Sequence, residues 1–216
     1  MARTMKFAAL LALPLLGAVT APASAAIVFT ADLTNAQEVV PASPLTTAIG
    51  GPRPISFGTA SFTLNDAQTA LSMSVSVFNI DITGSQTVDT NDNLVAAHIH
   101  APAQPGFNGP VVWGFFGAPD NDNNPDNLVI APFATDVGGV FTSVWNAPEG
   151  NGGTTLLAQL PNLLSGLAYL NFHTVQFPGG EIRGQINPVP EPSSLLLFAA
   201  ACAIGLSRRL RISRRG

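Results

Sequence analysis

The alternation of apolar and polar side chains is the dominant pattern along the chain, and it predicts β-strands. In the clearest stretch, from Leu71 to Val77, every odd position is apolar and serine occupies every even position. This period of two is typical of a strand with one face in a core and the other in water. After Val77 the apolar frame shifts to Phe78, Ile80 and Ile82, so we expect a β-bulge near Val77 and Phe78.

Further segments of short apolar alternation follow the same rule and are separated by Gly, Pro and Asn turn residues. Seven to nine short strands at this spacing predict an all-β domain, either an antiparallel β-sandwich or a partly open barrel. Leucines recur at helical spacing between Thr154 and Ser165, and Pro161 limits the length of any helix there. We therefore expect one short helical segment, packed on an end of the strands. The other strands are predicted at residues 27–33, 56–64, 94–100, 110–115, 137–146, 167–174 and 181–186.

The charge of the central part of the chain is strongly acidic. Between residues 26 and 187, 12 acidic residues stand against only two cations, Arg53 and Arg183. Nucleic-acid binding needs a basic face, so that class of function is excluded. The only cysteine is Cys202, near the C-terminus, so the domain must fold without disulfides.

The first 25 residues have the features of a secretory signal peptide. Arg3 and Lys6 precede an apolar run over residues 7–19, and a small-residue site, Ala23-Ser24-Ala25, follows. This order predicts export and cleavage by signal peptidase after Ala25. A membrane anchor is the alternative, which the short run and its proline disfavour.

The C-terminal segment, residues 188–216, combines three ordered features. Pro190-Glu191-Pro192 precedes an uncharged apolar stretch over residues 193–207, which predicts a short helix in the membrane, and five arginines follow between Arg208 and Arg215. Together they resemble the PEP-CTERM sorting signal of Gram-negative bacteria. That resemblance implies recognition and cleavage by an exosortase, and delivery to the cell surface or its exopolysaccharide matrix. A plain tail anchor is the alternative.

The three histidines carry the most suggestive chemistry of the domain, residues 26–187. His98 and His100 alternate on one predicted strand, which places both imidazoles on the same face. If the strand at 167–174 pairs with it, His173 shares that face and lies close to both. Asn171, Glu181 and Arg183 would complete this polar face. We expect Glu181 and Arg183 to form a structural ion pair, and contact with a ligand is the alternative.

Several of these segments also resemble, in order and spacing, the CHRD domain, a module first described in chordin. The resemblance covers roughly residues 27–187 and implies an extracellular β module with no agreed reaction. Its most specific stretch is Gly179-Gly180-Glu181-Ile182-Arg183-Gly184. The other segments that carry it are Phe29 to Leu33, Ala36 to Val39, Ala97 to Pro102, Gly109 to Val112 and Tyr169 to Thr174.

Three interpretations of the histidines stay open. His98, His100 and His173 are a suitable set for Cu or Zn, because neutral imidazoles are common ligands of both ions. They could instead fix the fold by hydrogen bonding to Glu181, Asn171 or the backbone. Catalysis by a histidine with Glu181 is the third, but no Gly-x-Ser-x-Gly or His-Glu-x-x-His motif accompanies them, and we do not expect an enzyme.

An acidic loop offers a second potential metal site. Asp120, Asp122 and Asp126 present carboxylates at alternate or near positions, which suits weak calcium binding. The stretch is no EF-hand, because Pro125 occupies the position of the required glycine. A solvated surface loop is the alternative.

These observations predict an exported, disulfide-free β protein of the cell envelope, cell surface or extracellular matrix that acts by binding or as a structural part. Extracellular polysaccharide or other surface proteins would be its partners. The alternative is a secreted metalloprotein with Cu or Zn on the three histidines, with or without redox activity.

Overall fold

The computed structural model describes residues 26–123 and 128–190. The predictions for the signal peptide, the sorting tail with its helix, and Asp126 fall outside these residues. Within the described ranges, no helix is both long and apolar enough to span a membrane.

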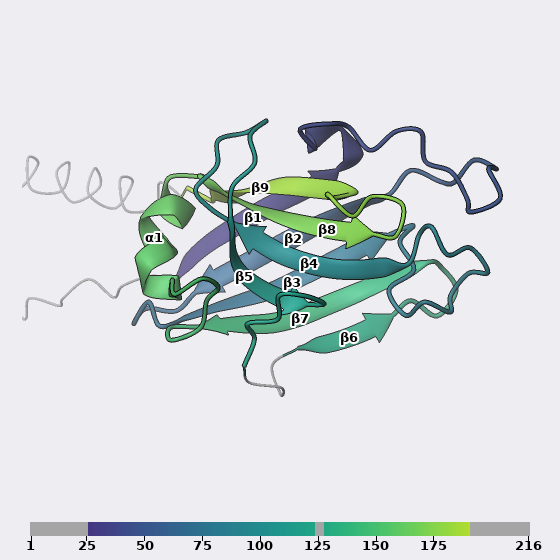
Figure 1. Ribbon diagram of the computed structural model, residues 1–216. Coiled ribbons are helices and arrows are strands. Elements are labelled where there is room, and N and C mark those ends of the chain that lie inside the picture. The colour runs from purple at the N-terminus through teal and green to yellow at the C-terminus, as the bar shows by residue number, and fades with distance from the viewer. Residues whose placement is uncertain (1–25, 124–127, 191–216) are drawn as a thin grey trace, which may run out of the picture.

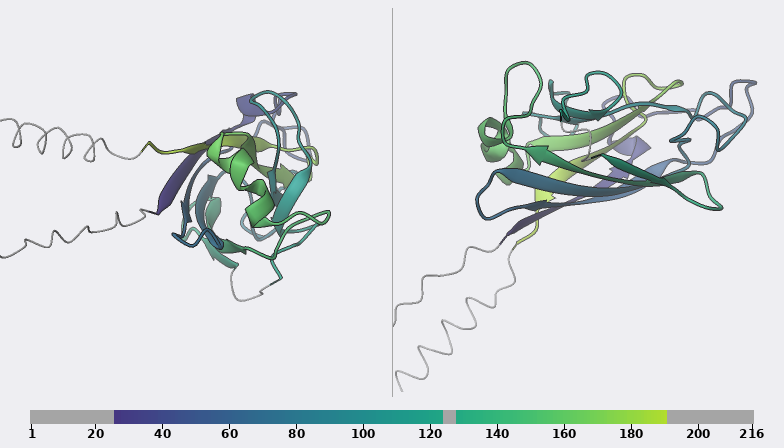
Figure 2. Two further views of the ribbon diagram at one scale, coloured as in Figure 1. Left: turned by 90° about the vertical axis from the view of Figure 1, so that its left-hand side faces the viewer. Right: turned by 90° about the horizontal axis from the view of Figure 1, so that it is seen from below.

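The described chain forms one antiparallel sheet of nine strands, curled into a half-barrel (Figure 1, Figure 2). This confirms the all-β prediction and, of its two forms, the partly open barrel. The spatial order is β5-β4-β8-β9-β1-β2-β3-β7-β6. The strands are β1 (Ile27–Thr34), β2 (Phe57–Leu64), β3 (Ala70–Phe78), β4 (Leu94–His100), β5 (Val111–Phe116), β6 (Val129–Pro132), β7 (Gly138–Asn146), β8 (Ala168–Thr174) and β9 (Ile182–Pro188), and a 3-10 turn, η1 (Asn35–Gln37), follows β1.

The core fills the inside of the curl. Alternate residues of β1, β2 and β3 are buried, as the period of two predicts. The two ends of the sheet meet across the core, since Trp113 on β5 stacks on Trp145 of β7 with ring centroids 5.5 Å apart. Both indoles are fully buried. The aromatic contact across the curl therefore holds together strands that are far apart in the sheet.

One helix, α1 (Leu156–Leu164), lies across an end of the curled sheet (Figure 2). Thr155 caps it by accepting a hydrogen bond from the Ala158 N–H. Leu156, Leu160 and Leu163 are buried against the core, as their spacing predicts. Pro161 lies inside this helix, which is only nine residues long.

Two details differ from the sequence-based expectations. The predicted bulge near Val77 and Phe78 is absent, because the pairing of β3 with β2 and β7 is continuous through both residues. Asn79, with a positive φ of 62°, turns the chain out of the strand instead. The short strand β6 was not predicted. It is an edge strand that pairs only with β7, and its side chains show no alternation between buried and exposed positions.

The outer face of the sheet is exposed at some strands and buried at others. On β2 and β3 the outward residues are mostly exposed, whereas every residue of β8 is buried and the last five of β4 are too. Loops cover the outer face of β4, β8 and β9, through contacts such as those of Arg183 with Phe107 and of Gln185 with Ala103. This covered face holds the candidate site.

Candidate metal centre

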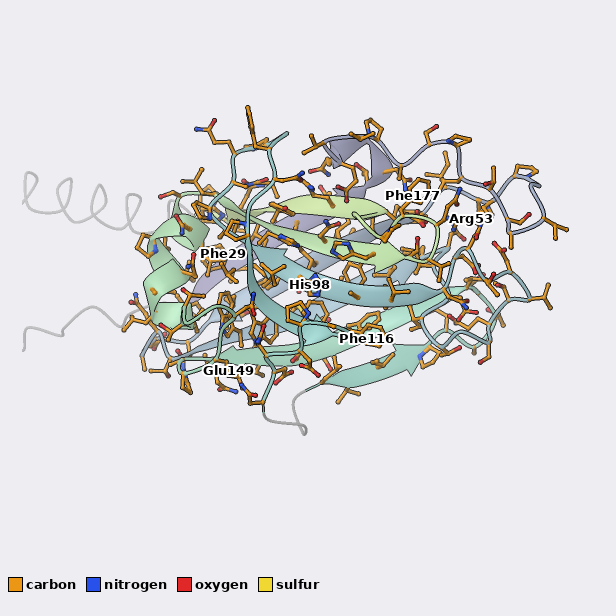
Figure 3. All side chains as sticks on the ribbon, in the orientation of Figure 1. Phe29, Arg53, His98, Phe116, Glu149 and Phe177 are labelled. Atoms are coloured by element: carbon orange, nitrogen blue, oxygen red, sulfur yellow. The ribbon has the colours of Figure 1, made fainter. Side chains whose placement is uncertain are left out.

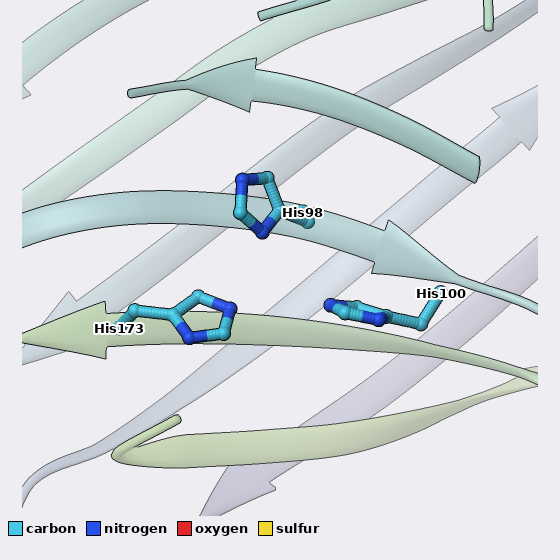
Figure 4. Close-up of side chains that lie close together, drawn as sticks. All are labelled: His98, His100 and His173. Carbon is cyan, nitrogen blue, oxygen red and sulfur yellow. The ribbon is translucent and has the colours of Figure 1, made fainter. Parts of the chain in front are cut away.

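The pairing of β4 with β8 brings the three histidines together. In this pairing His98 lies opposite Asn171, His100 opposite Tyr169, and Ala96 opposite His173. The imidazoles of His98, His100 and His173 point toward one another from the two strands (Figure 4). One ring nitrogen of each lies within 4.8 Å of the other two, so the predicted adjacency of His173 is confirmed.

The ring separations match those of histidines around one ion. The centroids are 5.0 Å apart for His98 and His173, 5.8 Å for His98 and His100, and 6.1 Å for His100 and His173. Three imidazoles bound at about 2.0–2.1 Å in a trigonal arrangement have centroids roughly 5.5 Å apart. Small side-chain movements would therefore bring all three nitrogens to one ion.

Backbone carbonyls of the covering loops fix the orientation of each ring. His98 Nε2 donates to the Ala118 carbonyl at 3.1 Å, His100 Nδ1 to Gly109 at 2.9 Å, and His173 Nδ1 to Pro178 at 3.0 Å. A carbonyl oxygen can only accept, so the proton of each neutral ring sits on that nitrogen. The lone pairs are then on the opposite nitrogens.

Those opposite nitrogens have no partner. His98 Nδ1, His100 Nε2 and His173 Nε2 are buried and make no hydrogen bond among the described residues. The side chains are nearly enclosed, with residue exposures of 5%, 8% and 7%. A carbonyl on the outer nitrogen and a free inner nitrogen is the usual arrangement of a metal-binding histidine.

One glycine makes this enclosure possible. Gly114 lies opposite His98 in the pairing of β4 with β5. A Cβ atom at this position would clash with the backbone oxygen of Pro119 and crowd the His98 ring. The absence of a side chain therefore lets the loop that carries the Ala118 carbonyl lie close over the ring.

Burial keeps the three imidazoles electrically neutral. It lowers the pKa of His98, and it lowers those of His100 and His173 from 6.5 to about 4, with smaller contributions from the neighbouring imidazoles and Arg183. Near neutral pH all three rings are neutral, so their lone pairs are free for an ion without competition from protons.

Tyr169 and Arg183 support the cluster from the same face. The Tyr169 ring stacks on His100 at 4.6 Å between centroids, and the Arg183 guanidinium lies 4.0 Å from the Tyr169 centroid. Arg183 also forms an ion pair with Glu38 at 2.9 Å and donates to the Asn108 side chain. Asn171, between Tyr169 and His173 on β8, shares this face by alternation, as predicted.

The predicted ion pair between Glu181 and Arg183 is wrong. Glu181 precedes β9, so its side chain does not follow the alternation of that strand. It is fully buried and pairs with Arg53 at 2.8 Å, and it accepts hydrogen bonds from Ser56 and Thr174. Arg53 lies toward the end of the sheet opposite α1, away from His98 (Figure 3). Glu181 therefore anchors a loop and is not part of the histidine face.

Sequence reasoning missed several contributors to the centre. Glu38 was noted only within a family-like segment, and Tyr169 was placed on the face of His173 without a role in the cluster. The carbonyls of Ala118, Gly109 and Pro178 leave no side-chain signal. Only the neighbouring proline and glycine residues marked these segments as turns.

The acidic loop does not form a comparable cluster in the described part of the chain. Asp120 is exposed, and the Asp122 carboxylate accepts a hydrogen bond from Ser143 at 2.5 Å. In residues 26–123 and 128–190, the one group of three or more His, Cys, Asp or Glu side chains placed to hold a metal ion is the histidine cluster. Calcium binding with Asp126 stays a prediction.

Two family models match the chain. The model described as CHRD domain matches residues 29–186, and the model described as PEP-CTERM protein-sorting motif matches residues 188–215. No curated protein matches the chain, and no solved structure does. The sorting motif indicates export and a location at the cell surface or in the envelope, and it implies processing by an exosortase.

The Arg53–Glu181 pair gives a prediction for stability. Replacing Arg53 with Met should lower the free energy of unfolding by about 3–5 kcal/mol, because it leaves the Glu181 carboxylate buried without its cation. The double variant Arg53→Met/Glu181→Gln should recover part of this loss. Urea unfolding followed by fluorescence of the buried tryptophans measures the free energy of unfolding of both variants. A decrease of less than about 1 kcal/mol in Arg53→Met is the range of an exposed ion pair, and it would contradict a buried pair that stabilises the fold.

The histidine pKa values give a second prediction, for the metal-free protein. The unfolded chain takes up protons on these rings near pH 6.5, and the folded protein resists protonation of His100 and His173 until about pH 4. The contribution of each of these two rings to stability should therefore fall by on the order of 3 kcal/mol as the pH decreases through this window.

Glu38 acts in the opposite direction, because burial raises its pKa to about 7 and its protonation favours the folded state at lower pH. Comparison with His173→Gln, which removes one titrating ring and keeps Glu38, isolates the histidine contribution. Unfolding of both proteins at several values from pH 7 to pH 4 measures it. If the free energy of unfolding depends on pH in the same way in the parent protein and in His173→Gln, His173 is not a buried neutral ring.

Proposed function

The chain belongs to the CHRD domain family, and we propose that its domain is an exported metal-binding module in which His98, His100 and His173 hold one copper or zinc ion at the cell surface. One observation carries this proposal. The ligand atoms of the three histidines lie within 4.8 Å of one another, and each ring has a buried nitrogen that finds no hydrogen-bond partner in the described part of the chain. Copper and zinc are the ions that neutral imidazole nitrogens commonly bind.

A purely structural role explains the outer nitrogens of the three rings and leaves the inner ones unexplained. The hydrogen bonds to Ala118, Gly109 and Pro178 would fix the loops whether or not an ion binds. A structural role does not explain the inner nitrogens, because a buried acceptor without a partner costs about 1–3 kcal/mol. Three such acceptors facing one another are stabilised together by a single cation.

We propose binding rather than a reaction as the function. The centre is built from imidazoles, a tyrosine and an asparagine. Arg183, which lies over the Tyr169 ring, forms an ion pair with Glu38. Association with extracellular polysaccharide or with surface proteins, which the sorting motif suggests, stays a prediction.

Metal analysis tests the proposed function. Protein expressed from the full-length gene without a polyhistidine tag should bind one equivalent of copper or zinc, and the variant His98→Ala/His100→Ala/His173→Ala should bind almost none. The variant Asp120→Asn/Asp122→Asn serves as a matched control that alters the acidic loop and should keep the ion. Equal metal binding by the triple variant, or no uptake by the parent protein, contradicts the proposal.

Processing at both ends is part of the same proposal. We expect signal peptidase to cleave after Ala25 and an exosortase to cleave near Pro190-Glu191-Pro192, so the surface form should begin at Ala26 and lack Arg208 to Arg215. The intact mass of protein released from the cell surface measures both ends. A mass that includes the arginines would favour the tail anchor.

A further inference from the structure

We propose that the histidine centre selects Cu(I) over divalent ions such as Zn²⁺ and Cu²⁺. This inference rests on the metal-binding function proposed above and names the ion. It follows from the charge of the ligands, from their burial, and from the cation placed beside them.

The ligand set is electrically neutral. Each ring donates a hydrogen bond to a backbone carbonyl and keeps that proton, so each binds as neutral imidazole. The cluster contains three histidines and no carboxylate or thiolate. The whole charge of the ion would therefore stay on the ion and its ligands, with no anion bound to it.

Because the site is buried, the charge of the ion determines how much desolvation its binding costs. The three histidines are 5–8% exposed, so the ion loses most of its contact with water. The desolvation cost of an ion grows with the square of its charge, so it is about four times larger for a divalent ion than for a monovalent one. Zn²⁺ held by three histidines usually keeps a water or hydroxide as a fourth ligand, which requires space and solvent. Cu(I) is stable with three nitrogen ligands alone.

The nearest cationic side chain acts in the same direction. The Arg183 guanidinium lies 4.0 Å from the centroid of the Tyr169 ring, and that ring stacks on His100. Through these two ring contacts the Arg183 charge lies close enough for its field to act on an ion held by the histidines. A divalent ion is repelled twice as strongly as a monovalent ion in the same field.

The acidic side chains nearby do not reverse this effect. Glu38 is the partner of Arg183, and burial raises its pKa to about 7, so it is only partly ionised near neutral pH. Glu181 is neutralised by Arg53. Asn171, which faces His98 across the strands, carries no charge.

Competitive titration of the metal-free protein tests the selectivity. Protein from the full-length gene, without a tag, is titrated with Cu(I) under anaerobic conditions against bicinchoninate, and separately with Zn²⁺ and Cu²⁺ against chelators of known affinity. We expect one equivalent of Cu(I), bound at least about 100-fold more tightly than either divalent ion. Zn²⁺ or Cu²⁺ bound as tightly as Cu(I) overturns the selectivity and leaves the metal-binding function standing. Failure of all three ions to bind overturns both.

A paired variant tests the contribution of the charge. Arg183→Met/Glu38→Gln removes the cation and its partner together and leaves the three histidines in place. The ratio of Cu(I) to Zn²⁺ affinity should decrease by up to about tenfold, the effect of removing one nearby unit charge at intermediate dielectric, less the part that the ionised fraction of Glu38 already offsets. Tryptophan fluorescence checks that the variant is folded. An unchanged ratio in a folded variant contradicts the electrostatic argument.

Discussion

The pairing of β4 with β8 beneath a cover of loops is the constraint on which the site depends. It sets His98 and His100 beside His173, and it forces the outer face of these strands to be buried. Polar side chains on a buried face need partners. The loops supply one for each imidazole, in the carbonyls of Ala118, Gly109 and Pro178, and leave the inner nitrogens directed at a common point.

The buried charges of the domain follow the same rule. Its two arginines are both buried, and each pairs with a buried glutamate on a distant segment: Arg53 with Glu181, and Arg183 with Glu38. These pairs attach the long segment after β1 to the strands β8 and β9. They also leave the surface of the described part of the chain without an exposed lysine or arginine, so the surface charge there is acidic. Such a surface attracts cations and disfavours binding to anionic polymers.

Most of the fold could be predicted from local pattern, since eight of the nine strands show apolar alternation or a short apolar run. The ninth, β6, is an edge strand with mostly exposed residues, so no buried face marks it. The His-x-His pattern on a strand was sufficient to predict that His98 and His100 share a face. The proximity of His173 depended on the pairing of the strand at 167–174 with that at 94–100, which local alternation alone does not establish.

Other parts of the site could not be predicted because they depend on tertiary structure. The two glutamate–arginine pairs join residues more than 100 positions apart. A local rule for strands favoured the pair Glu181 and Arg183, but Glu181 lies outside the strand. Backbone carbonyls are the same at every residue, so no sequence marks those that orient a ring.

Anomalous diffraction from crystals of the copper-loaded protein tests the account most directly. It predicts a single copper peak bound at about 2.0–2.1 Å by His98 Nδ1, His100 Nε2 and His173 Nε2, with the opposite nitrogens still donating to the three loop carbonyls. An ion bound elsewhere, or crystals with no copper between these rings, would contradict it.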